Sequence, residues 1–186
     1  MKKKLLMVLG PTEIEKDILK FASESQDYMR TEDYSKKWER IFENLKYTFQ
    51  TKNPVVVFAS SGTGAMDAAV TNFLCKKDSI LYINSGSFGK RWGDICNKYG
   101  INAIELPVEF GSRPNPSLVK ELLEQKPDIK AVFATLNETS SGSLTDIKAI
   151  GELLKVFPKT LFIVDCISGL LTEEFKQDDW NVDVAR

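Results

Sequence analysis

The sequence of 186 residues contains no histidine, and this absence excludes several common kinds of active site. Without an imidazole there can be no Ser-His-Asp triad, no Cys-His pair and no His-ligated zinc. Cysteine is also scarce, and Cys75, Cys96 and Cys166 lie too far apart in the sequence to form a Cys-x-x-Cys motif. We therefore expect buried free thiols, with neither a disulfide framework nor a metal site.

Long apolar runs and an excess of charge are missing as well. The apolar stretch 5–9 ends at Gly10-Pro11 and is too short for a secretory signal, and no window approaches the roughly 18 apolar residues of a membrane span. There are 25 Lys and Arg and 26 Asp and Glu residues, so the formal net charge of -1 gives no electrostatic reason to bind nucleic acid. These absences predict a cytoplasmic protein without a membrane or nucleic-acid partner.

What the sequence does contain is typical of a globular domain. Hydrophobic residues make up 42% and charged residues 27%, which excludes disorder. From residue 54 onward, apolar runs of strand type alternate with helical patterns. Strands are expected at 55–59, 80–83, 103–106, 131–134 and 161–165, and a further strand is expected to begin within 179–185. Helices are expected at 65–74, 116–123 and 147–156, and another ends near residue 99. This alternation favours the α/β class, with a mostly parallel sheet flanked by helices.

Residues 1–53 are expected to form an N-terminal segment with helices, ahead of the α/β domain at 54–186. Thr12 and Glu15 have the spacing of a capping box and predict a helix that begins at Thr12. Ser35 is expected to cap a second helix, because apolar residues recur after it at three- and four-residue steps, at positions 38, 41, 42, 45 and 49.

The first ligand-type motif follows the expected strand at 55–59. Residues 60–64 read Ser-Ser-Gly-Thr-Gly and precede a helix. Glycine allows a close backbone approach, hydroxyls donate hydrogen bonds, and the helix N-terminus favours an anion, so the segment suits a phosphate. A plain helix cap is the alternative interpretation. The segment matches neither Gly-x-Gly-x-x-Gly nor the P-loop pattern.

Three other strand ends add groups that could meet this phosphate, because the carboxyl ends of parallel strands gather at one edge of a sheet. Asp165 ends an apolar strand, and a buried carboxylate needs a partner such as a protonated ring nitrogen; a capping or solvent-facing Asp is the alternative. Phe88 lies between Gly86 and Gly89, where it could stack on a planar ligand or pack in the core. The segment 137–142 is rich in hydrogen-bonding groups, or is simply a polar turn. A phosphate, an aromatic face and a ring nitrogen are together the parts of pyridoxal phosphate.

These segments resemble the class V pyridoxal-phosphate-dependent aminotransferases, a family that includes alanine–glyoxylate, serine–pyruvate and 2-aminoethylphosphonate–pyruvate transaminases. The resemblance begins at Gly10 and continues to the last residue. Its motifs occur in the family's order, at 60–69, 86–91, 137–142 and 164–168. The resemblance implies the large domain of a fold-type I transferase, with pyridoxal 5′-phosphate as the cofactor.

The resemblance also implies which residues bind the cofactor. Ser61, Gly62 and Thr63 would hold the phosphate. Phe88 and Ile167 would lie against the two faces of the ring. Thr139 would bind the ring hydroxyl, and Asp165 would bind the ring nitrogen. Asp165 would have the catalytic role among them, because a carboxylate beside the ring nitrogen keeps it protonated and strengthens the cofactor as an electron sink.

One catalytic residue of the family has no counterpart in the sequence. The family's Schiff-base lysine stands in a Ser-x-Gln-Lys-like segment that would follow shortly after Arg186, so we expect an inactive N-terminal fragment of an enzyme. Lys176 is the only lysine after Asp165, and its place in a polar stretch before the last strand makes it a poor substitute. The resemblance implies that the intact parent is a homodimer that moves an amino group between a small amino acid and a 2-oxo acid such as pyruvate or glyoxylate.

Two other functions stay open at this point. The first is a pyridoxal-phosphate-dependent lyase or desulfurase of the same fold, although related desulfurases place a histidine where Phe88 stands. The second is a non-catalytic module that binds a nucleotide or a phosphorylated metabolite. The sequence does not determine the amino donor or acceptor.

Overall fold

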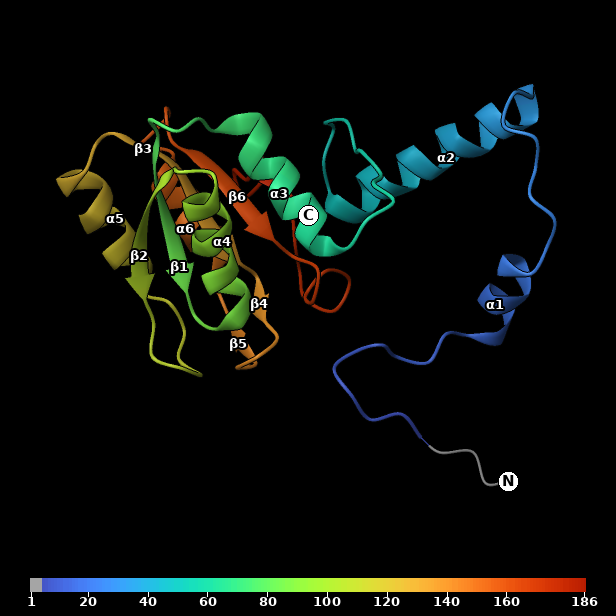
Figure 1. Cartoon of the computed structure of the whole chain (residues 1–186), viewed down its shortest axis with the longest axis horizontal. Coiled ribbons are helices and arrows are strands. Elements are labelled where there is room, and N and C mark those ends of the chain that lie inside the picture. Colours follow the sequence, from blue (N-terminus) through green and yellow to red (C-terminus); the bar gives the residue numbers. More distant parts are fainter. Residues whose placement is uncertain (1–4) are drawn as a thin grey trace. The chain divides into compact units, whose positions relative to one another are not determined.

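The computed structural model describes residues 5–186, and the chain divides into two units, Met1–Phe42 and Glu43–Arg186 (Figure 1). Helix α1 (Lys16–Ala22) belongs to the first unit, and helix α2 (Glu32–Phe49) spans the division. Among residues 5–186, no helix combines the length and the apolar character that crossing a membrane requires. The predicted domain boundary between residues 53 and 54 stays a prediction.

The first helix begins later than predicted. Helix α1 starts at Lys16, and its N-cap residue is Glu15, which makes no side-chain capping bond. The capping box predicted from Thr12 is therefore wrong. The backbone of Glu15 is extended, with φ −56° and ψ 141°, so the helix cannot include the residues that precede it.

The predicted cap of the second helix is also wrong. The hydroxyl of Thr31, directly before α2, accepts a hydrogen bond of 3.2 Å from the backbone N–H of Tyr34. Ser35 lies inside the helix, where its hydroxyl donates back to the carbonyl of Thr31 at 3.3 Å. A capping oxygen must stand just outside the first turn to reach a free N–H, and only Thr31 occupies that position.

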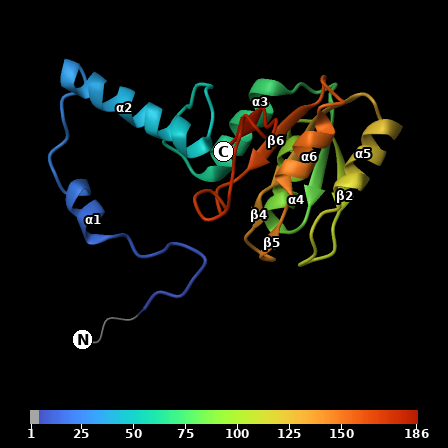
Figure 2. The ribbon, with the colours of Figure 1, turned by 180° about the vertical axis from the view of Figure 1, so that it is seen from behind.

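A parallel sheet of five strands forms the centre of the second unit, in the order β2-β1-β3-β6-β7 (Figures 1 and 2). The bounds of its strands are β1 (Ser79–Asn84), β2 (Asn102–Pro107), β3 (Ile129–Thr135), β6 (Leu161–Asp165) and β7 (Val184–Ala185). A separate antiparallel hairpin pairs β4 (Asn137–Glu138) with β5 (Ser143–Leu144). The predicted α/β class and parallel sheet are confirmed.

Helices cover both faces of this sheet. Their bounds are α3 (Gly62–Phe73), α4 (Ser87–Lys98), α5 (Pro116–Gln125) and α6 (Ile147–Leu154). Alternate residues of the central strand β3 show the division: Ala131 and Phe133 pack with residues of α3 and α4, whereas Val132 and Ala134 pack with residues of α5 and α6. Because both faces are covered, the strands are apolar on both sides, which explains the continuous apolar runs in the sequence.

The strand predicted at 55–59 is absent. Residues 54–58 have no regular structure, and Val56 is 66% exposed. A strand needs a neighbouring backbone to satisfy its N–H and C=O groups, and neither edge strand of the sheet, β2 or β7, pairs with this segment. The prediction was wrong because β-branched composition reports strand propensity and does not provide a partner strand.

The cysteines are free, as predicted, but they are not all buried. Cys96 and Cys166 are buried, and burial is the main cause that raises the pKa of each thiol to about 12. Cys75 is exposed because it lies in the turn between α3 and β1. The expectation of three buried thiols was therefore wrong for Cys75.

Asp178 ties the end of α2 to the segment before β7. Its carboxylate accepts hydrogen bonds from the Thr51 hydroxyl at 2.6 Å and from the Lys52 N–H at 2.9 Å. We expect Asp178→Ala to lower the free energy of unfolding by about 1 kcal/mol, because both donors lose an ionised acceptor. Urea unfolding measures this loss. The neighbouring Asp179→Ala is the control, and an equal effect of both substitutions would contradict the expected role of Asp178.

Candidate functional site

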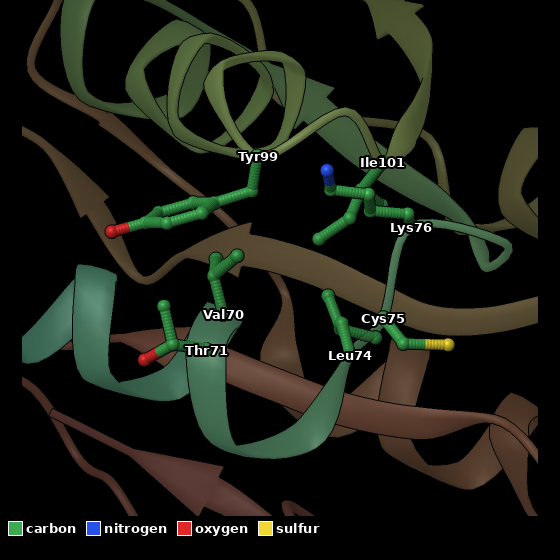
Figure 3. A pocket seen from close by; sticks show the side chains of 7 residues that line it. All are labelled: Val70, Thr71, Leu74, Cys75, Lys76, Tyr99 and Ile101. Carbon is green, nitrogen blue, oxygen red and sulfur yellow. The ribbon is translucent and has the colours of Figure 1, made fainter.

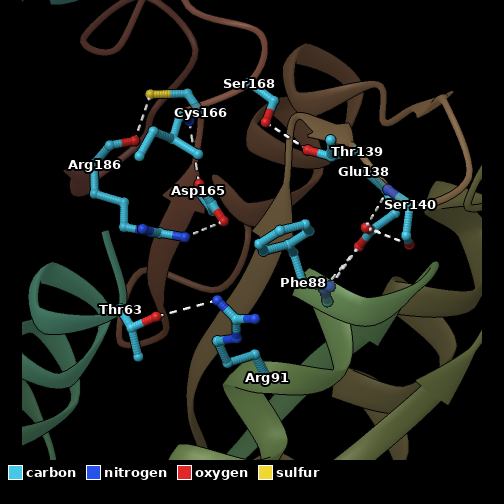
Figure 4. Close-up of polar contacts among 12 residues, drawn as sticks. Thr63, Phe88, Arg91, Glu138, Thr139, Ser140, Asp165, Cys166, Ser168 and Arg186 are labelled. Atoms are coloured by element: carbon cyan, nitrogen blue, oxygen red, sulfur yellow. Dashed lines mark hydrogen bonds and ion pairs between the residues drawn. The ribbon is translucent and has the colours of Figure 1, made fainter. Parts of the chain in front are cut away.

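Four of the predicted site residues, Thr63, Phe88, Thr139 and Asp165, lie around the carboxyl edge of the sheet (Figure 4). Thr135 ends β3 and is the register partner of Asp165, which ends β6. Side chains of register partners point to the same face of a sheet. Arg186 follows β7 and reaches the same place, so three neighbouring strands each contribute one polar side chain.

Asp165 is buried and forms an ion pair with Arg186. The side chains are only 1% and 8% exposed, respectively. The other carboxylate oxygen of Asp165 accepts a hydrogen bond of 3.1 Å from the backbone N–H of Ile167. Burial raises the pKa of Asp165 above its ordinary value, although the positive charge of Arg186 opposes this shift. The expectation that this carboxylate needs a partner is confirmed, but sequence reasoning missed that Arg186 supplies it.

The predicted phosphate segment forms the start of α3. Ser61 is the N-cap residue, and its side chain makes no capping hydrogen bond, so a side-chain cap is not its role in this structure. The N–H groups of Gly62 and Thr63 belong to the first turn, where helical N–H groups have no partner within the helix. Together with the positive end of the helix dipole, they form a place that favours an anion.

Gly62 allows other site residues to approach α3 closely. A Cβ atom at this position would overlap the guanidinium of Arg186 and would lie 2.9 Å from Cδ1 of Ile167. Any larger residue would push both side chains away from the helix. The glycine therefore leaves room for these two side chains beside the helix; the predicted approach of a ligand at this position stays a prediction.

Phe88 lies in the first turn of α4, which begins just after β1 at the carboxyl edge of the sheet (Figure 4). The ring is half-buried and belongs to neither buried core cluster, so plain core packing does not describe it. The guanidinium of Arg91 lies 4.7 Å from the ring centroid and also donates a hydrogen bond of 3.1 Å to the Thr63 hydroxyl. Arg91 therefore connects the aromatic ring to the phosphate segment. Its position three residues after Phe88, on the same side of a helix, was the signal that sequence reasoning overlooked.

Thr139 and Ile167 complete the predicted set from two different loops. Thr139 lies in the turn of the β4–β5 hairpin, and its hydroxyl is 2.5 Å from the hydroxyl of Ser168. Ile167 follows β6 and is 57% exposed, so its side chain is accessible. The contact between the Thr139 and Ser168 hydroxyls joins the hairpin to the segment after β6. Ser168 was not among the predicted site residues.

Two cavities in the described part of the chain lie elsewhere. One, of about 160 Å³, is lined by the second half of α3, the residues just after α3 and the residues just after α4 (Figure 3): Val70, Thr71, Leu74, Cys75, Lys76, Tyr99 and Ile101. The other, of about 240 Å³, is lined by residues that include Arg113, Thr145 and Trp180. Neither contains a predicted site residue.

The residues at the sheet edge fit a ligand with a phosphate, a flat ring and a positively charged nitrogen. The start of α3 favours the anion, Phe88 offers an aromatic face, and Asp165 already binds a flat cation, the Arg186 guanidinium. Within residues 5–186, the Thr135 hydroxyl and Nε of Arg186 are buried without a hydrogen-bond partner, so the site has polar groups left to satisfy. Pyridoxal 5′-phosphate has the matching chemistry.

Comparison with known proteins decides the family. The model of the class V aminotransferases matches residues 16–186. The chain belongs to this family. An uncharacterised aminotransferase of Methanocaldococcus jannaschii is 40% identical over 98% of the chain and 47% of its own length. The serine–glyoxylate aminotransferase of Methylorubrum extorquens is 30% identical over 97% of the chain and 46% of its own length.

A solved aminotransferase structure confirms the fold-type I architecture. The ureidoglycine–glyoxylate aminotransferase of Bacillus subtilis superposes with a TM-score of 0.90 at 27% identity, covering 96% of the chain and 46% of that protein. The chain thus spans about half the length of the relatives that it matches.

Proposed function

We propose that this chain is the cofactor-binding half of a pyridoxal-phosphate-dependent aminotransferase. The reaction would move an amino group between a small amino acid, such as alanine or serine, and a 2-oxo acid such as pyruvate or glyoxylate. The observation that carries the proposal is the buried Asp165 carboxylate, which holds a flat cation at the sheet edge where α3 and Phe88 also meet. Class V aminotransferases are pyridoxal-phosphate-dependent, and two relatives are named for glyoxylate as a substrate.

Ser61, Gly62 and Thr63 would hold the phosphate. Their N–H and hydroxyl groups stand at the positive end of α3, and Arg91 adds a full positive charge beside Thr63. The Ser61 side chain makes no bond within the helix cap, so its hydroxyl can donate to a ligand. The phosphate would anchor the cofactor at one end of the site.

Phe88 and Ile167 would lie against the faces of the ring, and Thr139 would donate to the ring hydroxyl. The side chain of Ile167 is accessible, and the ring of Phe88 is only half-buried, so each can offer apolar surface to a ligand. Ser168 would orient the Thr139 hydroxyl through their short contact. These groups would fix the plane of the ring relative to Asp165.

Asp165 would hold the proton on the ring nitrogen. A buried carboxylate stabilises a neighbouring cation strongly, so the nitrogen would stay protonated at neutral pH. Bound pyridoxal phosphate supplies the electron sink that transamination needs. Before Asp165 can take this role, the Arg186 guanidinium must leave its carboxylate. A Schiff-base lysine beyond residue 186, a homodimer and a cytoplasmic location remain part of the proposal.

The first test measures cofactor binding by the chain itself. We expect Asp165→Asn to weaken the binding of pyridoxal 5′-phosphate by about tenfold or more, because asparagine carries no charge to balance the ring nitrogen. Isothermal titration calorimetry measures this affinity. Asp146→Asn is the matched control, because Asp146 caps α6 away from the site and asparagine caps a helix equally well. Equal affinity in all three proteins would refute the proposed role of Asp165.

The second test separates transamination from elimination in the full-length protein. After mixing with alanine or serine, a transaminase converts its bound cofactor to the amine form, and added glyoxylate or pyruvate restores the aldehyde. A lyase or desulfurase returns the aldehyde without a 2-oxo acid. Absorbance spectra of the bound cofactor distinguish the two reactions, and the second outcome would replace the proposed reaction while leaving the cofactor site intact.

A further inference from the structure

Glu138 is a fully buried carboxylate to which the proposed function gives no role. It ends β4 and accepts hydrogen bonds with both oxygens (Figure 4). Oε2 accepts from the backbone N–H groups of Phe88 and Gly89, at 3.0 and 2.8 Å. Oε1 accepts from the N–H and the hydroxyl of Ser140, at 3.1 and 2.7 Å. One side chain therefore joins the hairpin loop to the start of α4.

Glu138 takes the place of a local cap for α4. The N-cap residue of this helix is Gly86, which has no side chain to accept a hydrogen bond. The N–H of Ser87 is instead accepted by the Ser140 hydroxyl at 2.9 Å, so the hairpin holds the first three N–H groups of the helix. The fit is close, because a Cβ atom on Gly86 would lie 2.6 Å from Cγ of Glu138. A negative charge at a helix N-terminus is also electrostatically favourable.

The residue held most directly by this arrangement is Phe88. Its ring is half-buried and lies outside the buried core clusters, so core packing alone does not determine where it points. We infer that Glu138 is a positioning residue that places the Phe88 ring against the cofactor by holding the first turn of α4. The inference rests on the proposed function, in which Phe88 stacks on the cofactor ring.

The substitution Glu138→Gln tests this inference with little change in shape. An amide nitrogen cannot accept a hydrogen bond, so glutamine can satisfy either the α4 pair or the Ser140 pair, but not both. We expect the affinity for pyridoxal 5′-phosphate to fall about tenfold, because a loosened Phe88 would lose its stacking contact. The affinity for inorganic phosphate should stay within about twofold, because phosphate binds at the start of α3 and does not need the ring.

Glu105→Gln is the matched control. Glu105 lies on β2 and also accepts two side-chain hydrogen bonds, from Tyr82 at 2.8 Å and Asn84 at 2.7 Å, but it does not contact α4 or the hairpin through them. We expect this variant to keep wild-type affinity for both ligands. Amide hydrogen exchange gives a readout without ligand: Glu138→Gln should speed exchange at Phe88 and Gly89, and Glu105→Gln should not.

The circular dichroism of bound pyridoxal 5′-phosphate is the spectroscopic signature, since it depends on how the ring is held. An unchanged signal and unchanged affinity in Glu138→Gln would overturn the inference. An equal loss of affinity for phosphate and for the cofactor would also overturn it, because the role would then be purely structural.

If Glu138→Gln does not fold, Ser140→Ala is the second variant. It removes one donor to Glu138 and the acceptor for the Ser87 N–H, and it is judged by the same criteria. If the wild-type chain binds phosphate but not the cofactor, the proposed function itself fails, and the inference with it.

Discussion

Arg186→Met is expected to make the stability of the fold fall more steeply than in the wild type as the pH rises. Burial already raises the pKa of Asp165, and the guanidinium of Arg186 is the main group that opposes this shift. Without it, burial and the negative charge of Glu138 raise the pKa of Asp165 further. An acid whose pKa is higher in the folded state than in the unfolded state stabilises the fold at low pH, and this contribution disappears as the pH rises through the folded-state pKa. Near pH 8, an unpaired buried carboxylate should cost about 3 kcal/mol.

Urea unfolding near pH 4, 6 and 8 measures this effect. Asp165→Asn combined with Arg186→Met should remove most of the added pH dependence, because no buried carboxylate is left to titrate. Arg113→Met is the control for losing an arginine, since Arg113 is exposed. If the single Arg186→Met variant has the same pH dependence as the wild type, the ion pair does not control the charge of Asp165.

Phe133→Ala is expected to lower the free energy of unfolding by about 3–5 kcal/mol. Phe133 is fully buried in the central strand β3, and its ring centroid lies 4.5 Å from that of Trp92 on α4. Removing the ring leaves a cavity between the sheet and α4, and neighbours in a close-packed core fill such a cavity only in part. Trp92 lies one helical turn after Phe88, so this contact also supports the helix that carries the ring of the site.

Urea unfolding at a single pH is sufficient for this prediction. Phe110→Ala removes the same side chain from a position that is 70% exposed, and we expect it to change the free energy of unfolding by less than about 0.5 kcal/mol. A loss below about 1 kcal/mol in Phe133→Ala would show that the core around β3 and α4 is not closely packed.

The α/β class and most of its elements follow from local patterns in the sequence. Each strand expected between residues 80 and 165 is present, and β6 has the predicted bounds, 161–165. These predictions succeeded because burial on both faces produces a local signal, a continuous apolar run between helical patterns. The segment 60–64 and Asp165 were also proposed as site residues from local signals, because a glycine-rich turn and a carboxylate at a strand end are unusual in themselves.

Which groups become partners depends on how the chain folds in three dimensions. Arg186 pairs with Asp165 from 21 residues away, and Glu138 binds Phe88 from 50 residues away. The segment 55–59 has the composition of a strand and is not one, because a strand forms only where another backbone pairs with it. Local patterns report the propensity and burial of each segment, whereas contacts at the site depend on the order of strands in the sheet. That order, β2-β1-β3-β6-β7, places the ends of distant strands side by side, and no local pattern contains it.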